Sequence, residues 1–186
     1  TDGEHFIHMN AAGASPMPAA AHDAVIQHLE LERSIGGYAA AGADKSRDPN
    51  GTECHAAVAA PLNVGADEIA LLESAQAAWA RAFYSLRLSG PSDRILCFES
   101  EYAGNACAFL QAARRTGVSI DVLPMRPNGV ADVAALQRKL ESPPPGGRDL
   151  VALTHVASDG SIVQPAAAVG ELTRRHGALY LLDACQ

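Results

Sequence analysis

The sequence predicts an α/β protein built on a mostly parallel sheet with helices on both faces. From residue 65 onward, short apolar runs typical of buried strands alternate with segments whose apolar residues recur at helical spacing. The chain has 186 residues, of which 48% are hydrophobic and 19% charged, so it is long and apolar enough to bury a sizeable core. Such alternation favours right-handed crossovers between parallel strands, which place helices on both faces of the sheet.

Two helices are expected before the sheet begins. Apolar residues recur at helical spacing in residues 18–31 and again in residues 53–62. The pattern is broken between them by Gly36 and Gly37 and by the polar run 44–51. We therefore predict an N-terminal helical segment that precedes the sheet.

Five strands and four helices are predicted in the rest of the chain. The predicted strands are residues 68–72, 94–98, 119–123, 150–154 and 179–182. The predicted helices are residues 76–86, 103–115, 130–140 and 166–176. This pattern divides the chain into a helical segment, residues 1–64, and a sheet-bearing part, residues 65–186. Because no helix follows the last strand to cover it, we expect the polypeptide to continue beyond Gln186 or a second chain to complete the fold.

Composition narrows the possible partners. The net charge is −7, with 14 basic and 21 acidic side chains, so no basic surface is expected to hold nucleic acid. No membrane-spanning segment, signal peptide or lipidation motif is recognised. The four cysteines show neither a C-x-x-C pair nor zinc-ligand spacing, so we predict no metal site and a reduced, cytoplasmic protein.

Ligands of open α/β sheets bind beyond the carboxyl ends of the strands, so the residues there are the candidates for a site. Ser74, Ala75 and Gln76 open a helix, and the free N–H groups of a helix N-terminus favour phosphate. Tyr102 suits stacking on a planar cofactor, while Gly104 allows close backbone approach. The structural alternatives are a plain N-cap by Ser74 and a packing role for Tyr102.

Two further strand ends carry polar side chains. Thr154, His155 and Asp159 supply a hydroxyl, an imidazole and a carboxylate within six residues, which suits acid–base chemistry. Asp183 at the tip of the last strand needs a cationic or hydrogen-bonding partner, for which a protonated pyridine nitrogen is one candidate. Capping of a loop or of the next helix is the alternative for each.

Together these segments resemble the class V aminotransferase family of pyridoxal-phosphate enzymes, which includes cysteine desulfurases, C–S lyases and isopenicillin N epimerase-like proteins. The end of the chain is similar to the family's Asp-Ala-x-Gln motif. The resemblance implies that Asp183 pairs with the pyridine nitrogen, as a catalytic residue, and that Gln186 reaches the ring 3-hydroxyl. It also implies that Ser74, Ala75 and Gln76 bind the phosphate, although Gln76 stands where Thr is usual.

The resemblance assigns three further segments. Tyr102 takes the place of the aromatic residue that stacks on the ring. The stretch that begins at Thr154 is similar to a Thr-His-Val-Ser-Asn stretch of the family, which makes His155 a predicted catalytic residue. Ser158 is then a predicted cofactor contact, although Asn is frequent there. The stretch around Ala12 and Gly13 resembles the N-terminal border of the substrate pocket, so these two residues are predicted to bind substrate.

By this resemblance we expect a fold type I large domain, incomplete at its C-terminus, that uses pyridoxal 5'-phosphate to act on a small amino-acid substrate. Residues 35–38 and 79–86 most resemble the hercynylcysteine sulfoxide lyase branch, which favours a C–S lyase or cysteine desulfurase over an aminotransferase or epimerase. The family's Schiff-base lysine lies beyond the Asp-Ala-x-Gln motif, and Lys45 and Lys139 follow no family motif.

We therefore expect that lysine and the small C-terminal domain to lie outside these residues. The expected partner is a second copy in a homodimer, or a second chain that carries the lysine. A non-catalytic or split-subunit chain is the alternative of another class.

Overall fold

The computed structural model describes residues 7–48 and 51–186 and separates into two compact units, Thr1–Leu71 and Leu72–Gln186. The division comes later than the predicted boundary between residues 64 and 65. The reason is a 3-10 turn, η1 (Ala66–Glu68), which contacts the helix α4 (Glu53–Leu62) and so belongs with the N-terminal unit.

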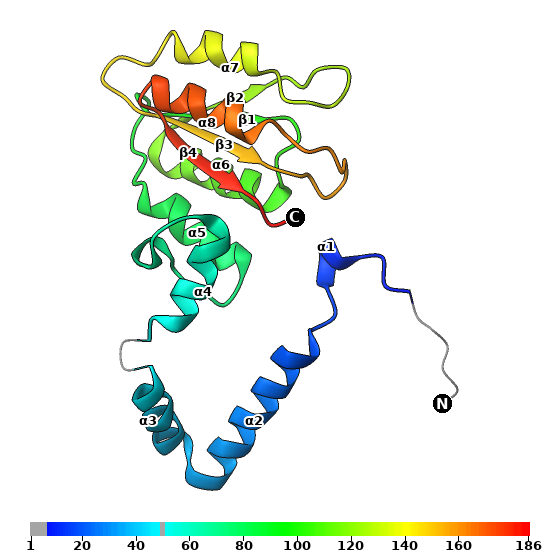
Figure 1. Ribbon diagram of the computed structural model, residues 1–186. Helices are drawn as coiled ribbons and strands as arrows, with labels where there is room; N and C mark the ends of the chain where they lie inside the picture. Colours follow the sequence, from blue (N-terminus) through cyan, green and yellow to red (C-terminus); the bar gives the residue numbers. More distant parts are fainter. Residues whose placement is uncertain (1–6, 49–50) are drawn as a thin grey trace. The chain divides into compact units, whose positions relative to one another are not determined.

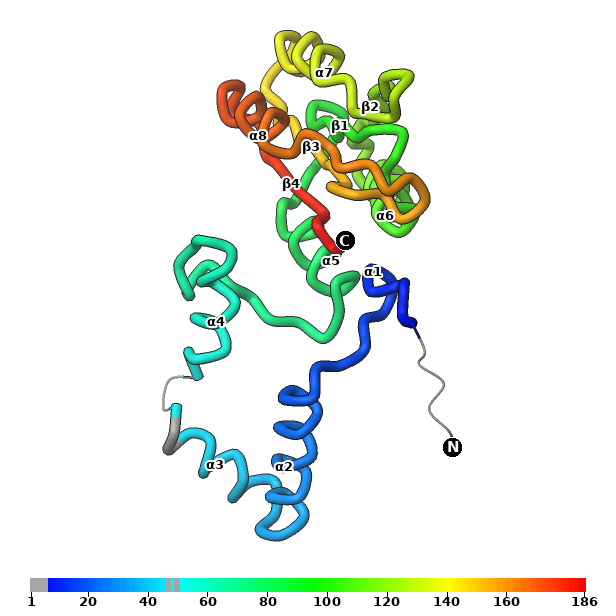
Figure 2. The backbone as a smooth tube through the Cα atoms, turned by 45° about the vertical axis from the view of Figure 1, so that its right-hand side comes forward, coloured from blue at the N-terminus to red at the C-terminus, as the bar shows by residue number. Residues whose placement is uncertain are grey.

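The N-terminal unit is helical (Figures 1 and 2). Besides α4 and η1 it contains α1 (Ala11–Ala14), α2 (Ala19–Ile35) and α3 (Gly37–Arg47). The helices predicted at residues 18–31 and 53–62 are thus present as α2 and α4, whereas α3 was not predicted.

Gly36 explains the break between α2 and α3. Its φ of 85° is a left-handed value that glycine adopts without a steric penalty, and its N–H donates to the carbonyl of Glu32 at 2.8 Å. The chain therefore ends α2 at Gly36 and starts a new helix at Gly37 instead of entering a loop.

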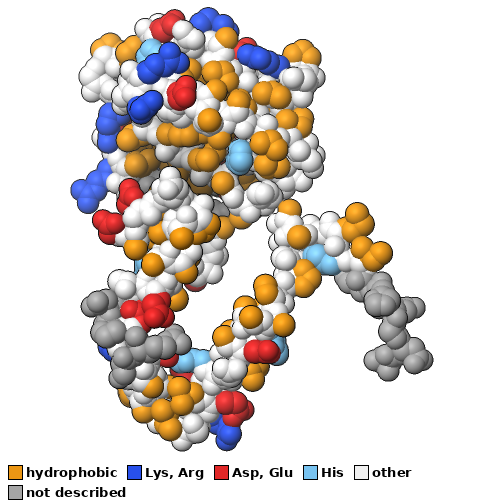
Figure 3. Space-filling view, viewed as in Figure 1, with side chains coloured by type: hydrophobic (Ala, Val, Ile, Leu, Met, Phe, Trp, Pro, Cys, Tyr) orange, Lys and Arg blue, Asp and Glu red, His pale blue; other side chains and the backbone are white. Residues whose placement is uncertain are grey.

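Little of the N-terminal unit is buried. Among its described residues, Ala40 and Ala59 are the buried ones. Most apolar side chains of α2 lie exposed, including Val25, Ile26 and Leu29, and Figure 3 shows hydrophobic side chains along this helix.

The second unit holds an all-parallel sheet of four strands in the order β2-β1-β3-β4. The strands are β1 (Arg94–Phe98), β2 (Ser119–Leu123), β3 (Asp149–Thr154) and β4 (Leu179–Asp183). They match four of the five predicted strands. The prediction of a strand at residues 68–72 was wrong: Glu68 ends η1, the following residues are irregular, and Leu71 is 53% exposed.

Helices cover both faces of this sheet, as predicted (Figure 1). The residues of β1 alternate between two hydrophobic clusters: Ile95 and Cys97 pack in one, Leu96 and Phe98 in the other. The first cluster includes α5 (Ala75–Ser85) and α6 (Ala103–Thr116), and the second includes α7 (Val133–Leu140) and α8 (Ala166–Arg175).

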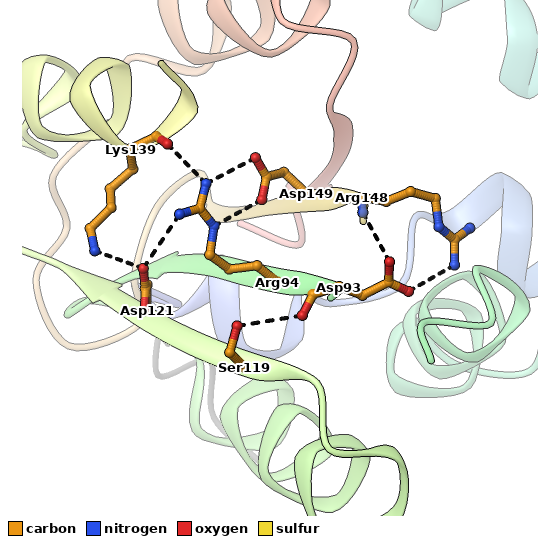
Figure 4. A network of polar contacts seen from close by, with 7 residues as sticks. All are labelled: Asp93, Arg94, Ser119, Asp121, Lys139, Arg148 and Asp149. Carbon is orange, nitrogen blue, oxygen red and sulfur yellow. Dashed lines mark hydrogen bonds and ion pairs between the residues drawn. The ribbon is translucent and has the colours of Figure 1, made fainter. Parts of the chain in front are cut away.

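Ion pairs connect the strands at their amino ends (Figure 4). Arg94 binds Asp149 through two bonds, Nε to Oδ1 at 2.9 Å and Nη2 to Oδ2 at 3.0 Å. Lys139 Nζ donates to Asp121 Oδ2 at 2.8 Å, and Arg94 Nη1 lies 3.8 Å from the same oxygen. Arg94 and Asp149 begin β1 and β3, and Asp121 lies midway along β2, so the network joins three strands to α7. In the part of the chain that the structure describes, no helix is both long and apolar enough to cross a bilayer.

Candidate active site

A cavity of about 160 Å³ lies at the carboxyl ends of β3 and β4. Thr154, the last residue of β3, pairs in the parallel register with Asp183, the last residue of β4, and both line the cavity. Residues in the first turns of α5 and α6 also line the cavity. The site thus forms where chain topology predicts a ligand in an open α/β sheet.

Six of the predicted site residues line this cavity. They are Ala75, Gln76, Tyr102, Ser158, Asp183 and Gln186. Ser74 and His155 are not among the lining residues. Ala12 and Gly13 belong to the N-terminal unit, so their role in substrate binding stays a prediction.

The N-terminus of α5 offers backbone donors to the cavity. Ser74 caps this helix, since its Oγ accepts from the N–H of Ala77 at 3.1 Å. The N–H groups of Ala75 and Gln76 stand at the first two helical positions, where no intrahelical acceptor exists, and they bond to none of the described residues. With the positive end of the helix dipole, these two amides suit an anionic group.

Asp183 is fixed from three sides. Its Oδ2 accepts from Asn105 Nδ2 at 2.8 Å, and its Oδ1 accepts from the backbone N–H of Cys185 at 3.2 Å. Its carbonyl accepts from the N–H of His155 at 2.8 Å. His155 therefore supports Asp183 through its backbone, and its predicted catalytic role stays a prediction.

Behind Asp183 lies a buried polar cluster that the sequence analysis did not identify. Asn105 is 1% exposed, and its Nδ2 also donates to Glu101 Oε1 at 3.0 Å. The same oxygen accepts from the Thr154 hydroxyl and from the Tyr102 N–H. The available signal was Asn105 itself, because an amide side chain in the first turn of an amphipathic helix, four residues after a carboxylate, commonly makes a local hydrogen bond.

Trp79 and Cys185 also line the cavity without having been predicted. Trp79 is held by an aromatic cluster, with its ring centroid 5.0 Å from that of Phe83 and 5.6 Å from that of Phe109. One wall of the cavity is thus continuous with the hydrophobic core.

Among the residues that the structure describes, no lysine lines the cavity. Lys139 pairs with Asp121 at the amino ends of the strands, and Lys45 lies in the N-terminal unit. Within residues 7–48 and 51–186, no group of three or more His, Cys, Asp or Glu side chains is arranged to hold a metal ion.

Several known proteins are similar to this chain in sequence or in fold. The chain is 21% identical over its whole length to a probable cysteine desulfurase of Halalkalibacterium halodurans, of which the match covers 45%. It is 30% identical over 97% of its length to a probable hercynylcysteine sulfoxide lyase of Mycobacterium tuberculosis, of which the match covers 42%. The chain therefore spans less than half the length of these curated relatives.

Two solved structures show the same architecture. The cystine C–S lyase C-DES in complex with cysteine persulfide superposes with a TM-score of 0.76 at 22% identity, covering 94% of this chain and 46% of that one. The cysteine desulfurase CsdA of Escherichia coli gives a TM-score of 0.71 at 19% identity, covering 92% and 43%. The family model for Aminotransferase class-V matches residues 7–186. The chain therefore belongs to the class V aminotransferase family, a family of enzymes that depend on pyridoxal 5'-phosphate.

Proposed function

We propose that this chain forms the cofactor-binding part of a pyridoxal-phosphate enzyme that cleaves the C–S bond of a cysteine-derived substrate. The observation that carries the proposal is the placement of Asp183. Its carboxylate is fixed by Asn105 and lines the same cavity as the free amides at the start of α5.

The cavity residues fit the chemistry of the cofactor. The amides of Ala75 and Gln76 suit its phosphate, and the Asp183 carboxylate suits a protonated ring nitrogen. Tyr102, which is 47% exposed, provides an aromatic face beside the cavity. Gln186 offers an amide to the ring hydroxyl. When bound, the cofactor supplies an electron-withdrawing ring that stabilises negative charge at the substrate Cα.

Asp183 has a defined part in that chemistry. A carboxylate beside the ring nitrogen keeps a proton on that nitrogen, and this strengthens electron withdrawal by the ring. Hydrogen bonds from Asn105 and from the Cys185 backbone hold the carboxylate in place before any ligand arrives. The proposed role of this chain is therefore to bind, orient and keep protonated the cofactor ring.

The relatives support C–S bond cleavage as the reaction type. The M. tuberculosis relative is named as a lyase of hercynylcysteine sulfoxide, and that of H. halodurans as a cysteine desulfurase. Both names refer to a sulfur-bearing amino acid. We propose a cysteine or an S-substituted cysteine as the substrate class, with the Schiff-base lysine supplied from outside these 186 residues.

Product analysis of the full-length protein tests this proposal. We expect an S-substituted cysteine and water to give pyruvate, ammonia and the released sulfur compound if the protein is a lyase. Cysteine and an acceptor thiol give alanine and a persulfide if it is a desulfurase. With an added keto acid as amino acceptor, the keto acid of the substrate together with the aminated acceptor would instead indicate an aminotransferase, and racemised substrate an epimerase. Turnover of neither substrate would contradict the enzyme function and favour the non-catalytic alternative.

Cysteine labelling tests the cavity without requiring turnover. Cys185 lines the cavity and is exposed, whereas Cys107 is exposed outside it. We expect 4-deoxypyridoxine 5'-phosphate, which lacks the cofactor's aldehyde, to slow alkylation of Cys185 but not of Cys107, as measured by peptide mass spectrometry. Cys97 is an internal control because burial, and then the charges of Glu101 and Asp121, raise the pKa of its thiol to about 12. Equal labelling of Cys185 with and without the analogue would contradict the proposed cofactor site.

We further propose a cytoplasmic homodimer, which rests on resemblance to the family. Light scattering of the full-length protein tests the oligomer, and a monomer at micromolar concentration would contradict it. Cell fractionation tests the location.

A further inference from the structure

We propose that Asn105 is a positioning residue that fixes the Asp183 carboxylate by tying it to Glu101, a second carboxylate that does not line the cavity. The contacts among these residues are shown by the structure. The consequence for a ligand rests on the proposed function, in which Asp183 contacts the cofactor ring.

The orientation of the Asn105 amide follows from its surroundings. Its side-chain nitrogen lies 2.8 Å from Asp183 Oδ2 and 3.0 Å from Glu101 Oε1. Both of these atoms are carboxylate oxygens, which accept hydrogen bonds, so the NH₂ group and not the oxygen of the amide faces them. Each of its two hydrogens then serves one carboxylate. Because Asn105 is 1% exposed, water cannot replace either bond without opening the structure.

Glu101 is the anchor of this arrangement. Besides Asn105, its Oε1 accepts from the backbone N–H of Tyr102 at 2.9 Å and from the hydroxyl of Thr154. Thr154 is 4% exposed and ends β3. Three donors on one oxygen immobilise the Glu101 carboxylate. Because Asn105 is bonded to this fixed carboxylate, it also holds Asp183 in place at the end of β4.

The chain of contacts leaves one side of Asp183 for a ligand. Its Oδ2 is taken by Asn105, while Oδ1 accepts one backbone N–H at 3.2 Å and keeps capacity for a second donor. The neutral amide also separates two carboxylates that would otherwise repel each other. Without the NH₂ group no donor links the two carboxylates, and the Asp183 carboxylate is free to leave its position.

The variant Asn105→Leu tests this inference because it keeps about the size of the side chain and removes the donor without adding a titratable group. The probe is 4-deoxypyridoxine 5'-phosphate, titrated by calorimetry into the full-length apoprotein. We expect the variant to bind the probe about tenfold more weakly or worse, the scale of losing a hydrogen bond to a charged group. The matched control is Asn128→Ala, in an exposed turn outside the cavity, which we expect to bind like the wild type.

A pH titration separates positioning from a general structural defect. The absorption of the bound probe reports whether its ring nitrogen carries a proton. We expect the midpoint to move to lower pH in Asn105→Leu, because a displaced Asp183 no longer holds that proton. Binding of inorganic phosphate, which depends on the start of α5, should change little, whereas a damaged fold would weaken it as well.

The outcomes distinguish the two proposals. A wild-type protein that does not bind the probe would contradict the proposed function. A wild type that binds, with a folded Asn105→Leu variant of equal affinity and equal pH midpoint, would overturn the positioning role. If circular dichroism shows Asn105→Leu to be unfolded, Glu101→Met, which removes the acceptor oxygen, replaces it: weaker probe binding with a lowered midpoint supports the inference, and unchanged values overturn it.

Discussion

At the residue scale, the space beside Gly104 determines where two cavity side chains lie. A Cβ atom at this position would stand 2.7 Å from Tyr102 Cε1 and 2.8 Å from Gln76 Oε1, closer than such atoms approach in real proteins. Both neighbours line the cavity. Glycine at residue 104 therefore allows the tyrosine ring and the glutamine amide to occupy their places at the start of α6.

We predict that Gly104→Ala weakens binding of the cofactor analogue without destabilising the fold. The atoms in the way are the ends of side chains, which can turn aside, and alanine favours helix over glycine by up to about 1 kcal/mol. Thermal unfolding should therefore be unchanged or shifted upward, while calorimetry shows reduced affinity. Gly42→Ala in α3 is the control, since a Cβ there meets nothing within 4 Å. Wild-type affinity in Gly104→Ala would show that Tyr102 and Gln76 need no such clearance.

The sequence was informative about site residues that follow a strand and much less so about those that act through tertiary contact. Asp183 and Gln186 were recognisable because they stand directly beyond the last apolar run. Asn105 was not, because its bond to Asp183 joins residues 78 positions apart in the chain. Only the fold brings α6 beside β4 and gives that amide a second carboxylate.

At the scale of elements, an apolar run predicted a strand correctly only where a neighbouring strand pairs with it. Residues 94–98 became β1 because both faces of this run are covered, by α5 and α6 on one side and α7 and α8 on the other. Residues 68–72 have a similar composition but pair with no strand among the described residues, so Glu68 ends η1 and the backbone of residues 69–72 is irregular. The helix α3 was missed because the pair Gly36 and Gly37 is typical of a loop, whereas Gly36 ends α2 and Gly37 already begins α3.

The amino ends of the strands depend on Asp93 as well as on the Arg94 pair (Figure 4). Burial by itself raises the pKa of Asp93, but the N–H of Ser89 and the side chain and N–H of Arg148 outweigh it and lower the pKa below 3.8. The Asp93 oxygens lie 2.7 Å from the Ser89 nitrogen and 3.0 Å from Arg148 Nη2. Asp93 thus ties the segment before β1 to the start of β3.

We predict that the second unit loses stability as the pH falls below about 4, in part because Asp93 becomes protonated. Its pKa is lowered in the folded state, so its contribution is full above the ordinary value of 3.8 and is lost as the pH falls through the folded value. Asp93→Asn should lower the free energy of unfolding by about 1–3 kcal/mol at pH 7. It should also weaken the decrease of that free energy at acid pH. Urea unfolding between pH 2 and 7 measures both effects. If the free energy of unfolding falls as steeply at acid pH in the variant as in the wild type, the loss of stability comes from other carboxylates.

At the scale of the whole molecule, the two units differ in how their helices are stabilised. In the second unit, α6 buries Asn105, Ala108, Phe109 and Ala112 against the sheet. The longer α2 of the N-terminal unit has no buried residue. Helices in water gain most of their stability from tertiary packing, so these two should differ strongly in how often they open.

Hydrogen exchange of the 186-residue chain tests this difference directly. We predict that the amides of α2 exchange at least about a hundredfold faster than those of α6, because an unpacked helix opens locally while α6 opens only with the core around it. The two helices are comparable, since α2 has 17 residues and α6 has 14, and each ends at a glycine of positive φ. The slowest amides should lie in β3, whose six residues are all buried between the helix layers. Protection of α2 equal to that of α6 would mean that its exposed apolar side chains, Val25, Ile26 and Leu29 among them, are covered in solution.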